Sequence, residues 1–356
     1  MHDLLSRLGL KFPIFQAPMA GTATPKMAAA VSESGGLGSV GLASAGPDGA
    51  KEMIVAIRAA SNRPFNVNLF CHRPATPNPA RESAWLDRLR PSFESFGSEP
   101  PAALREINTS FLIDEAMLDV LLEQRPPVIS FHLGLPQPEK VAALKKTGAI
   151  LVASATNLAE GEAAVAAGMD AVVAQGYEAG GHRGIFDPER EDTRLGTFAL
   201  TRLLVEKLPI PVIAAGGIMD GAGIAAALDL GAVAAQLGTA FIGCPESAAD
   251  EGYRKALQSD AAYRTEMIAS ISGRPARCLA NHFTVLASKL GDGIPDYPIA
   301  YDAAKALNAA AKAAGETGFG PQWAGQGAPL ARPMPAAALV ARLGEEWRAA
   351  VATSRP

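Results

Sequence analysis

Short apolar runs alternate with longer amphipathic stretches along most of this chain. Each apolar run has the length of a β-strand that is buried on both faces. We identify eight such runs, at residues 13–17, 37–42, 65–70, 127–132, 149–153, 171–174, 211–215 and 233–237. The stretches between them have helical spacing, at residues 24–34, 48–60, 114–124, 138–146, 157–167, 197–208 and 220–230. This alternation predicts an α/β fold, a (β/α)8 TIM barrel, which a last helix at residues 335–351 closes.

Two segments are longer than barrel connections require. Residues 72–113 carry six prolines among arginine, glutamate and serine, with a short helical pattern only at 85–89. The second long segment separates the eighth strand from the last helix. We interpret both as parts of a smaller, mainly helical cap. The predicted division is a barrel of residues 1–72, 114–243 and 313–356, with a cap domain of residues 73–113 and 244–312.

The composition narrows the class of protein. The 356 residues carry a formal net charge of −4, so they provide no basic surface of the kind that binds nucleic acid or anionic membranes. The three cysteines lie far apart without CxxC spacing, which favours small buried side chains in a reducing compartment. The N-terminus lacks a signal-peptide pattern, and the most apolar long stretch, residues 222–243, is interrupted by Asp229 and Gly231. We therefore expect a cytoplasmic protein that binds neither nucleic acid nor membrane.

The loop after the sixth predicted strand, residues 175–184, concentrates polar groups among four glycines. Gly180 and Gly181 remove the Cβ atoms beside His182, which lets the backbone approach a flat ligand and adopt positive φ. Polar loops at the C-terminal ends of parallel strands carry the chemistry of many α/β enzymes. An ordinary turn with a surface histidine is the alternative. The concentration of polar groups beside a buried strand favours a site.

The loops after the seventh and eighth predicted strands indicate a phosphate site. The first contains Gly216 and Gly217 before a helix start, and the second contains Gly238 and Thr239. Backbone N–H groups, a helix N-terminus and a hydroxyl are suitable partners for an anion. Tight turns with an N-cap at Asp220 would explain either loop alone. Because barrels commonly bind phosphate with this pair of loops, we favour the phosphate site.

Further side chains that could contact a ligand stand at the ends of predicted strands. They are Gln16, Met19, Asn68, His132 and Gln175. Amides there can read the edge of a flat heterocycle without adding charge. Together with the phosphate loops they favour FMN over a phosphosugar, because lysine and arginine are scarce at these positions. The histidines and cysteines do not have the spacing of a metal site. The G-x-G-x-x-G pattern at 36–41 is excluded as a dinucleotide motif, because a predicted helix precedes it and a predicted strand contains it.

Tyr297, Tyr301 and Lys305 recur at a spacing of four, and Pro298 favours a helix start beside them. One helix face would then present two phenols and an ammonium group, which is suitable for a small anionic substrate. An amphipathic helix that packs its aromatic residues on a core has the same pattern. The residues alone leave both interpretations open.

Four ordered motifs resemble those of the nitronate monooxygenases, formerly called 2-nitropropane dioxygenases. They are Q-A-P-M-A-G at 16–21, S-F-H-L-G at 130–134, Q-G-Y-E-A-G-G-H-R-G at 175–184 and A-A-G-G-I at 214–218. The resemblance is greatest to the class whose first motif is Q-A-P-M-A-G, and it extends to W-A-G-Q-G at 323–327. One departure is Leu133, which stands where a second aromatic residue often follows the histidine.

The resemblance implies a barrel that binds FMN non-covalently and holds no metal. It makes His182 the catalytic histidine, and it places His132, Tyr297, Tyr301 and Lys305 on the substrate side. The flavin contacts that it implies, with the glycines of the loops described above, are Met19, Asn68, Gln175, Gly180, Gly181, Gly216, Gly217, Gln236, Leu237, Gly238 and Thr239.

The implied reaction is the oxidation of an alkyl nitronate by O2 to a carbonyl compound and nitrite, a detoxification, with propionate 3-nitronate as the expected substrate. Because a nitronate is already an anion, His182 would hydrogen-bond or stabilise charge, and it would act as a base toward neutral nitroalkanes. The partners are then the nitronate and O2, on a monomer or homodimer. One alternative is a flavin barrel that reduces an enoyl-acyl carrier protein or a quinone with NAD(P)H. Another is a non-catalytic barrel that binds FMN or senses a phosphosugar.

Overall fold

The computed structural model describes residues 3–354 and contains a barrel of eight parallel strands. The strands follow the order β1-β9-β8-β6-β5-β4-β3-β2, and a bridge between Phe15 and Leu37 joins the two edge strands. The TIM barrel prediction is therefore confirmed. The bounds of the strands are β1 (Ile14–Gln16), β2 (Gly38–Gly41), β3 (Phe65–Phe70), β4 (Val128–His132), β5 (Ile150–Ala155), β6 (Ala171–Gln175), β8 (Val212–Ala215) and β9 (Ala234–Leu237).

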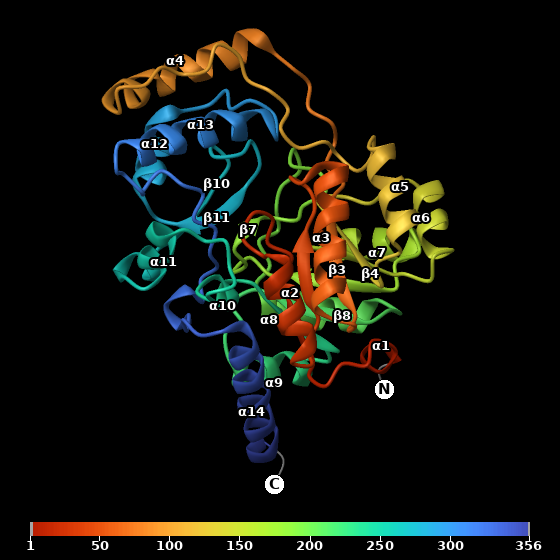
Figure 1. The fold of residues 1–356 in the computed structure, drawn as a ribbon. Helices are drawn as coiled ribbons and strands as arrows, with labels where there is room; N and C mark the ends of the chain where they lie inside the picture. Colours follow the sequence, from red (N-terminus) through yellow and green to blue (C-terminus); the bar gives the residue numbers. More distant parts are fainter. Residues whose placement is uncertain (1–2, 355–356) are drawn as a thin grey trace.

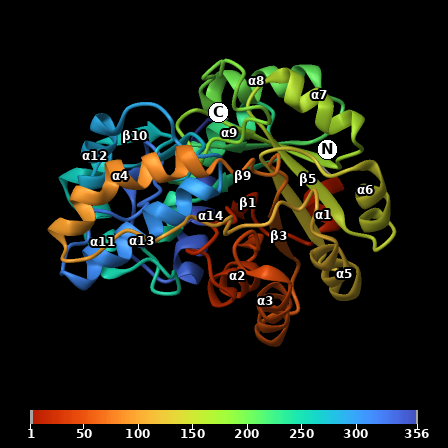
Figure 2. The same ribbon diagram turned by 90° about the horizontal axis from the view of Figure 1, so that it is seen from above.

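Helices surround this ring of strands, as Figure 2 shows. Several begin where a side chain caps the first turn: Thr24 accepts from the N–H of Met27, and Asp220 accepts from the N–H of Gly223. A short helix that the sequence pattern did not reveal, α1 (Asp3–Arg7), contributes Leu4 to the apolar cluster at the N-terminal end of the barrel. The other bounds are α2 (Pro25–Glu33), α3 (Gly46–Ala60), α5 (Glu115–Gln124), α6 (Pro138–Lys145), α7 (Leu158–Ala166), α8 (Thr197–Lys207), α9 (Gly221–Asp229) and α14 (Ala336–Ser354).

The glycines at 36–41 serve helix packing. A Cβ atom on Gly38 would lie 1.9 Å from the carbonyl oxygen of Ala28 in α2, so only glycine lets that helix pack on β2. The G-x-G-x-x-G pattern therefore reflects a close helix–strand contact.

A second group of elements lies beside the barrel, at the upper left of Figure 1. It contains α4 (Pro79–Ser95), α11 (Glu251–Leu257), α12 (His282–Leu290) and α13 (Ile299–Ala313). Trp85, Leu89 and Phe93 of α4 pack against Phe283 and Leu307 in a separate apolar cluster. The sequence prediction of a short helical patch at 85–89 was too narrow, because α4 continues through Pro91 over 17 residues.

This group also contains an antiparallel sheet that the sequence analysis missed. Its strands are β10 (Thr265–Ile268), β11 (Ala276–Leu279) and the two-residue β7 (Gly181–His182), in the order β10-β11-β7. Since β7 comes from the loop after β6, this sheet connects the barrel to the second group of elements. The short remaining elements are α10 (Thr239–Ile242) and the 3-10 helices η1 (Asp260–Tyr263) and η2 (Ala328–Leu330). No helix of residues 3–354 is long and apolar enough to cross a membrane.

Candidate active site

One cavity at the C-terminal ends of the barrel strands brings together nearly all the predicted site residues. Its walls come from barrel loops and from α13, and it extends from the glycines after β8 to Lys305. Leu237 is the exception, because its side chain packs in the apolar cluster around α9 and α14. The predicted residues that line the cavity are Met19, Asn68, His132, Gln175, Gly180, Gly181, His182, Gly216, Gly217, Gln236, Gly238, Thr239, Tyr297, Tyr301 and Lys305.

The backbone of His182 is held from both sides. His182 pairs with Ala276 of β11, so it lies in a strand rather than in the open loop that the sequence predicted. Its carbonyl oxygen accepts hydrogen bonds from Nε2 of His132 and from Nε2 of Gln175, each at 3.0 Å. Gln175 also accepts from the N–H of Gly184 at 2.7 Å. These contacts connect the end of β6 to β7 and fix the position of His182.

His132 uses both ring nitrogens within the protein. A carbonyl oxygen only accepts, so Nε2 of His132 carries the proton that it donates to His182. Nδ1 is therefore the acceptor for the hydroxyl of Ser154, at 2.5 Å. The ring lines the cavity with its nitrogens occupied, and its predicted substrate role remains a prediction.

Aromatic rings surround the imidazole of His182. The ring centroid lies 5.2 Å from that of Tyr297, 5.3 Å from Trp323, 5.8 Å from Phe70 and 6.3 Å from Tyr301. Nε2 of His182 lies 2.9 Å from the hydroxyl oxygen of Ser272. The Tyr297 hydroxyl accepts from Asn108 at 3.1 Å, and the ammonium of Lys305 lies 4.9 Å from the centre of the Tyr301 ring.

Burial controls the charge of these groups. It lowers the pKa of His182 to about 3, and the neighbouring His132, Arg274 and His72 act in the same direction. Burial also lowers the pKa of His132 to about 4. Both imidazoles are therefore neutral at pH 7. Desolvation raises the pKa of Tyr301 to about 12, so that its hydroxyl keeps its proton and can donate.

The cavity favours an anion. Of the described residues that line it, none is an aspartate or glutamate, whereas Lys305 contributes a cation. Burial lowers the pKa of Lys305, and Asp302 opposes that shift. Residues 3–354 contain no group of three His, Cys, Asp or Glu side chains that could hold a metal ion.

At the end of the cavity opposite Lys305, the backbone conformation and close contacts explain why glycines are present. Gly216 and Gly217 adopt φ values of 121° and 70°, which side chains rarely tolerate, and a Cβ on Gly216 would lie 2.6 Å from the Thr197 hydroxyl. Gly180 is required by another contact, because its Cβ would lie 2.5 Å from the backbone of Ala324 and Gly325. The predicted approach of a flat ligand is therefore not the only reason for glycine there.

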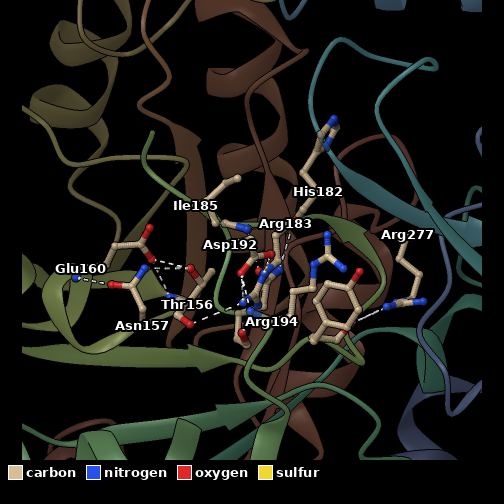
Figure 3. A network of polar contacts seen from close by, with 12 residues as sticks. Thr156, Asn157, Glu160, His182, Arg183, Ile185, Asp192, Arg194 and Arg277 are labelled. Atoms are coloured by element: carbon tan, nitrogen blue, oxygen red, sulfur yellow. Dashed lines mark hydrogen bonds and ion pairs between the residues drawn. The ribbon is translucent and has the colours of Figure 1, made fainter. Parts of the chain in front are cut away.

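Arg183 anchors the segment that follows His182, as Figure 3 shows. Its side chain is buried, and its guanidinium donates to both carboxylate oxygens of Asp192, at 2.8 and 3.0 Å. It also donates to the carbonyl oxygens of Gln175 and Thr156. Arg183 thereby connects β5, β6 and β7 behind the cavity. The sequence motif contains it, but its contacts are with protein groups.

Sequence reasoning missed several residues of this site. Phe70 is the last residue of a correctly predicted strand, so its place at the strand end could have been used. Asn108, Ser272 and Trp323 reach the site through contacts between distant segments. The local sequence of Asn108 and Ser272 carries no signal of that role, whereas Trp323 begins the W-A-G-Q-G segment of the family resemblance.

Sequence comparisons with known proteins indicate one family. The sequence profile of the family described as nitronate monooxygenase matches residues 2–346. A nitronate monooxygenase of Paraburkholderia phytofirmans is 59% identical over 349 residues, which are 98% of this chain and 95% of that protein. A nitronate monooxygenase of Pseudomonas aeruginosa is 53% identical over 350 residues, 98% of this chain and 100% of that protein. The solved structure of nitroalkane oxidase from Streptomyces ansochromogenes has a TM-score of 0.91 and 37% identity, covering 99% of this chain and 100% of that one.

Proposed function

The chain belongs to the nitronate monooxygenase family, whose members are flavin-dependent oxidoreductases, and we propose that it oxidises alkyl nitronates with O2. The products are a carbonyl compound and nitrite, and the substrate that we propose is propionate 3-nitronate, whose removal is a detoxification. The main support for this proposal is the composition of one cavity. One end is lined by glycines, the other end carries a lysine without any carboxylate, and buried amides also line the cavity.

We infer that the flavin is FMN, held without a covalent bond. The backbone at Gly216 and Gly217 has positive φ and lines the cavity without side chains, as a phosphate-binding loop requires. Gly238 and Thr239 line the same end, and the amides of Asn68 and Gln175 face the cavity with Met19 and Gln236. When bound there, FMN supplies the redox chemistry, accepting electrons from the nitronate and passing them to O2.

The other end of the cavity would hold the nitronate. Lys305 provides a positive charge, and the phenol of Tyr301 provides a hydroxyl that remains protonated. His182 would contact the substrate as the catalytic histidine. The rings of Phe70, Tyr297 and Trp323 exclude water around it, which strengthens the polar contacts.

The proposal is tested with the purified protein and its His182→Asn variant. The wild type should consume O2 and release nitrite from propionate 3-nitronate, and it should oxidise NADH poorly with a quinone. The variant should retain FMN but lose at least about tenfold in kcat/KM, which is roughly 1.4 kcal/mol of transition-state stabilisation. Rapid NADH-dependent reduction of a quinone or enoyl substrate would favour the reductase alternative. Wild-type turnover in the variant would remove His182 from the mechanism. Cytoplasmic location and the monomeric or dimeric state remain predictions of the sequence.

A further inference from the structure

The turn between β10 and β11, residues 269–275, lies against the ring of His182. Ser272 of this turn is fully buried, and its hydroxyl oxygen lies 2.9 Å from Nε2 of His182. The same hydroxyl donates to the carbonyl oxygen of Arg274 at 3.1 Å. Ser272 therefore connects the ring of the proposed catalytic histidine to the backbone of its own turn.

The proton arrangement of this pair follows from the number of available hydrogens. A serine hydroxyl has one hydrogen, and the Arg274 carbonyl is an acceptor only. If Ser272 gives its hydrogen to Arg274, it must accept from His182, so that Nε2 of His182 carries the ring proton. If Ser272 instead gave its hydrogen to Nε2 of His182, the buried carbonyl oxygen of Arg274 would lose its hydrogen bond from the Ser272 hydroxyl.

The other ring nitrogen then faces the ligand space. Nδ1 of His182 has no hydrogen-bond partner within residues 3–354. It is also absent from the fully buried polar atoms that lack a partner, so part of its surface is exposed. Since the residue lines the cavity, Nδ1 is the nitrogen accessible from it. Burial lowers the pKa of the ring to about 3, so Nδ1 holds a lone pair at neutral pH.

The turn that carries Ser272 has little freedom to move. Gly273 adopts a φ of 94°, and a Cβ atom there would lie 2.5 Å from the backbone nitrogen of Tyr297. The strand that follows pairs directly with β7, with Ala276 opposite His182. The turn thus packs against two residues that line the cavity, and the Ser272 hydroxyl is held at a defined place.

We propose that Ser272 is a positioning residue that fixes the orientation and tautomer of His182, with the proton on Nε2 and the lone pair of Nδ1 directed into the cavity. The proposal deepens the proposed function and rests on it for its catalytic consequence. In the resting enzyme His182 is then a hydrogen-bond acceptor, and donors to a nitronate oxygen come from Tyr301 or Lys305. If Nδ1 gains a proton, Ser272 still accepts from Nε2.

The direct test is 15N NMR of the flavin-bound enzyme labelled at histidine, which has five histidines. The His182 signals are identified by their loss in His182→Asn. The wild type should show a protonated Nε2 and an unprotonated Nδ1, and Ser272→Ala should move both shifts toward a tautomer average. A proton on Nδ1 in the wild type, or wild-type shifts in Ser272→Ala, would overturn the proposal.

Kinetics with propionate 3-nitronate provide the second test. Ser272→Ala should lose at least fivefold in kcat/KM at unchanged flavin content, and Ser272→Thr, which keeps the hydroxyl, should recover to within twofold of wild type. Ser270→Ala is the matched control, because Ser270 is buried in the same turn and has no contact with His182 among the described residues; it should stay within twofold. Equal losses in all three variants would assign Ser272 a merely structural role. Should the wild type lack nitronate turnover, the proposed function fails, whereas the NMR result still decides the tautomer.

Discussion

Replacement of Asp192 by asparagine tests whether the Arg183 anchor supports the site. The Arg183 side chain is 1% exposed and that of Asp192 is 17% exposed. The substitution leaves an almost identical shape but removes the negative charge opposite a buried guanidinium. Since Arg183 directly follows His182, the change should affect both stability and activity.

The expected loss of stability can be worked out from these contacts. Breaking a buried ion pair by removing one partner costs about 3–5 kcal/mol, and the partial exposure of Asp192 favours the lower end, about 3 kcal/mol. Unfolding entropy is about 2.1 cal/mol/K per residue, or roughly 0.75 kcal/mol/K for a chain of this length. We therefore expect the melting temperature of Asp192→Asn to fall by roughly 4 °C.

The pH dependence gives a second, independent expectation. Burial acts to raise the pKa of Asp192, but the hydrogen bonds from Arg183 and from the N–H of Arg194 outweigh it, so the pKa is held below its usual value. The ion pair therefore stabilises the protein above the ordinary carboxyl pKa of about 3.9, and this stabilisation is lost as the pH falls through the lower folded value. The difference between wild type and variant should be complete at pH 7 and should shrink below about pH 4.

Thermal unfolding at pH 7 and at acidic pH provides the assay, with Glu206→Gln as the control. Glu206 pairs with Arg202 on the surface, where both side chains are more than half exposed, so its loss should cost at most about 0.5 kcal/mol. A melting temperature of Asp192→Asn within 1 °C of wild type, or a difference that persists unchanged in acid, would refute this reasoning.

Two further predictions concern the two ends of the cavity. Gly217→Val should purify with less FMN, because a β-branched residue is strained at a φ of 70° and its side chain would press on Glu178, which would move the proposed phosphate loop. Full flavin content would contradict that site. Gly315→Val, at a φ of 84° outside the cavity lining, is the control that should retain flavin. Lys305→Met should raise the KM for propionate 3-nitronate by roughly fivefold, about 1 kcal/mol, and that for ethyl nitronate less, because only the former has a second negative charge. Lys312 lies elsewhere on α13 and pairs with Asp250, so Lys312→Met is the control and should leave KM unchanged. Equal effects of the two lysine variants would exclude a contact between Lys305 and the substrate.

The barrel was predictable because each of its strands is a local apolar run. The predicted strand at 65–70 has the observed bounds, and the helices predicted to begin at residues 24 and 220 begin at Pro25 and Gly221. Prediction failed where structure depends on distant partners. The strands of the small antiparallel sheet have two to four residues each, and β7 is paired only through residues more than ninety positions away.

The candidate site also contains residues that local sequence could predict and residues that depend on distant contacts. Residues at strand ends could be placed in one cavity from the order of the strands alone, since parallel strands end on the same face. The side chain of Leu237 lies outside the cavity lining because side chains of a strand alternate between faces, whereas a run of consecutive residues was assigned to the flavin. Ser272 and His182 are separated by 90 positions, so only the folded chain reveals their contact.

The account is tested most directly by mixing the purified, flavin-containing protein with substrate in the absence of O2. We predict that propionate 3-nitronate bleaches or changes the visible flavin spectrum rapidly, that NADH leaves it essentially unchanged, and that admission of air restores the spectrum and releases nitrite. Rapid bleaching by NADH with no response to the nitronate would contradict the proposed function.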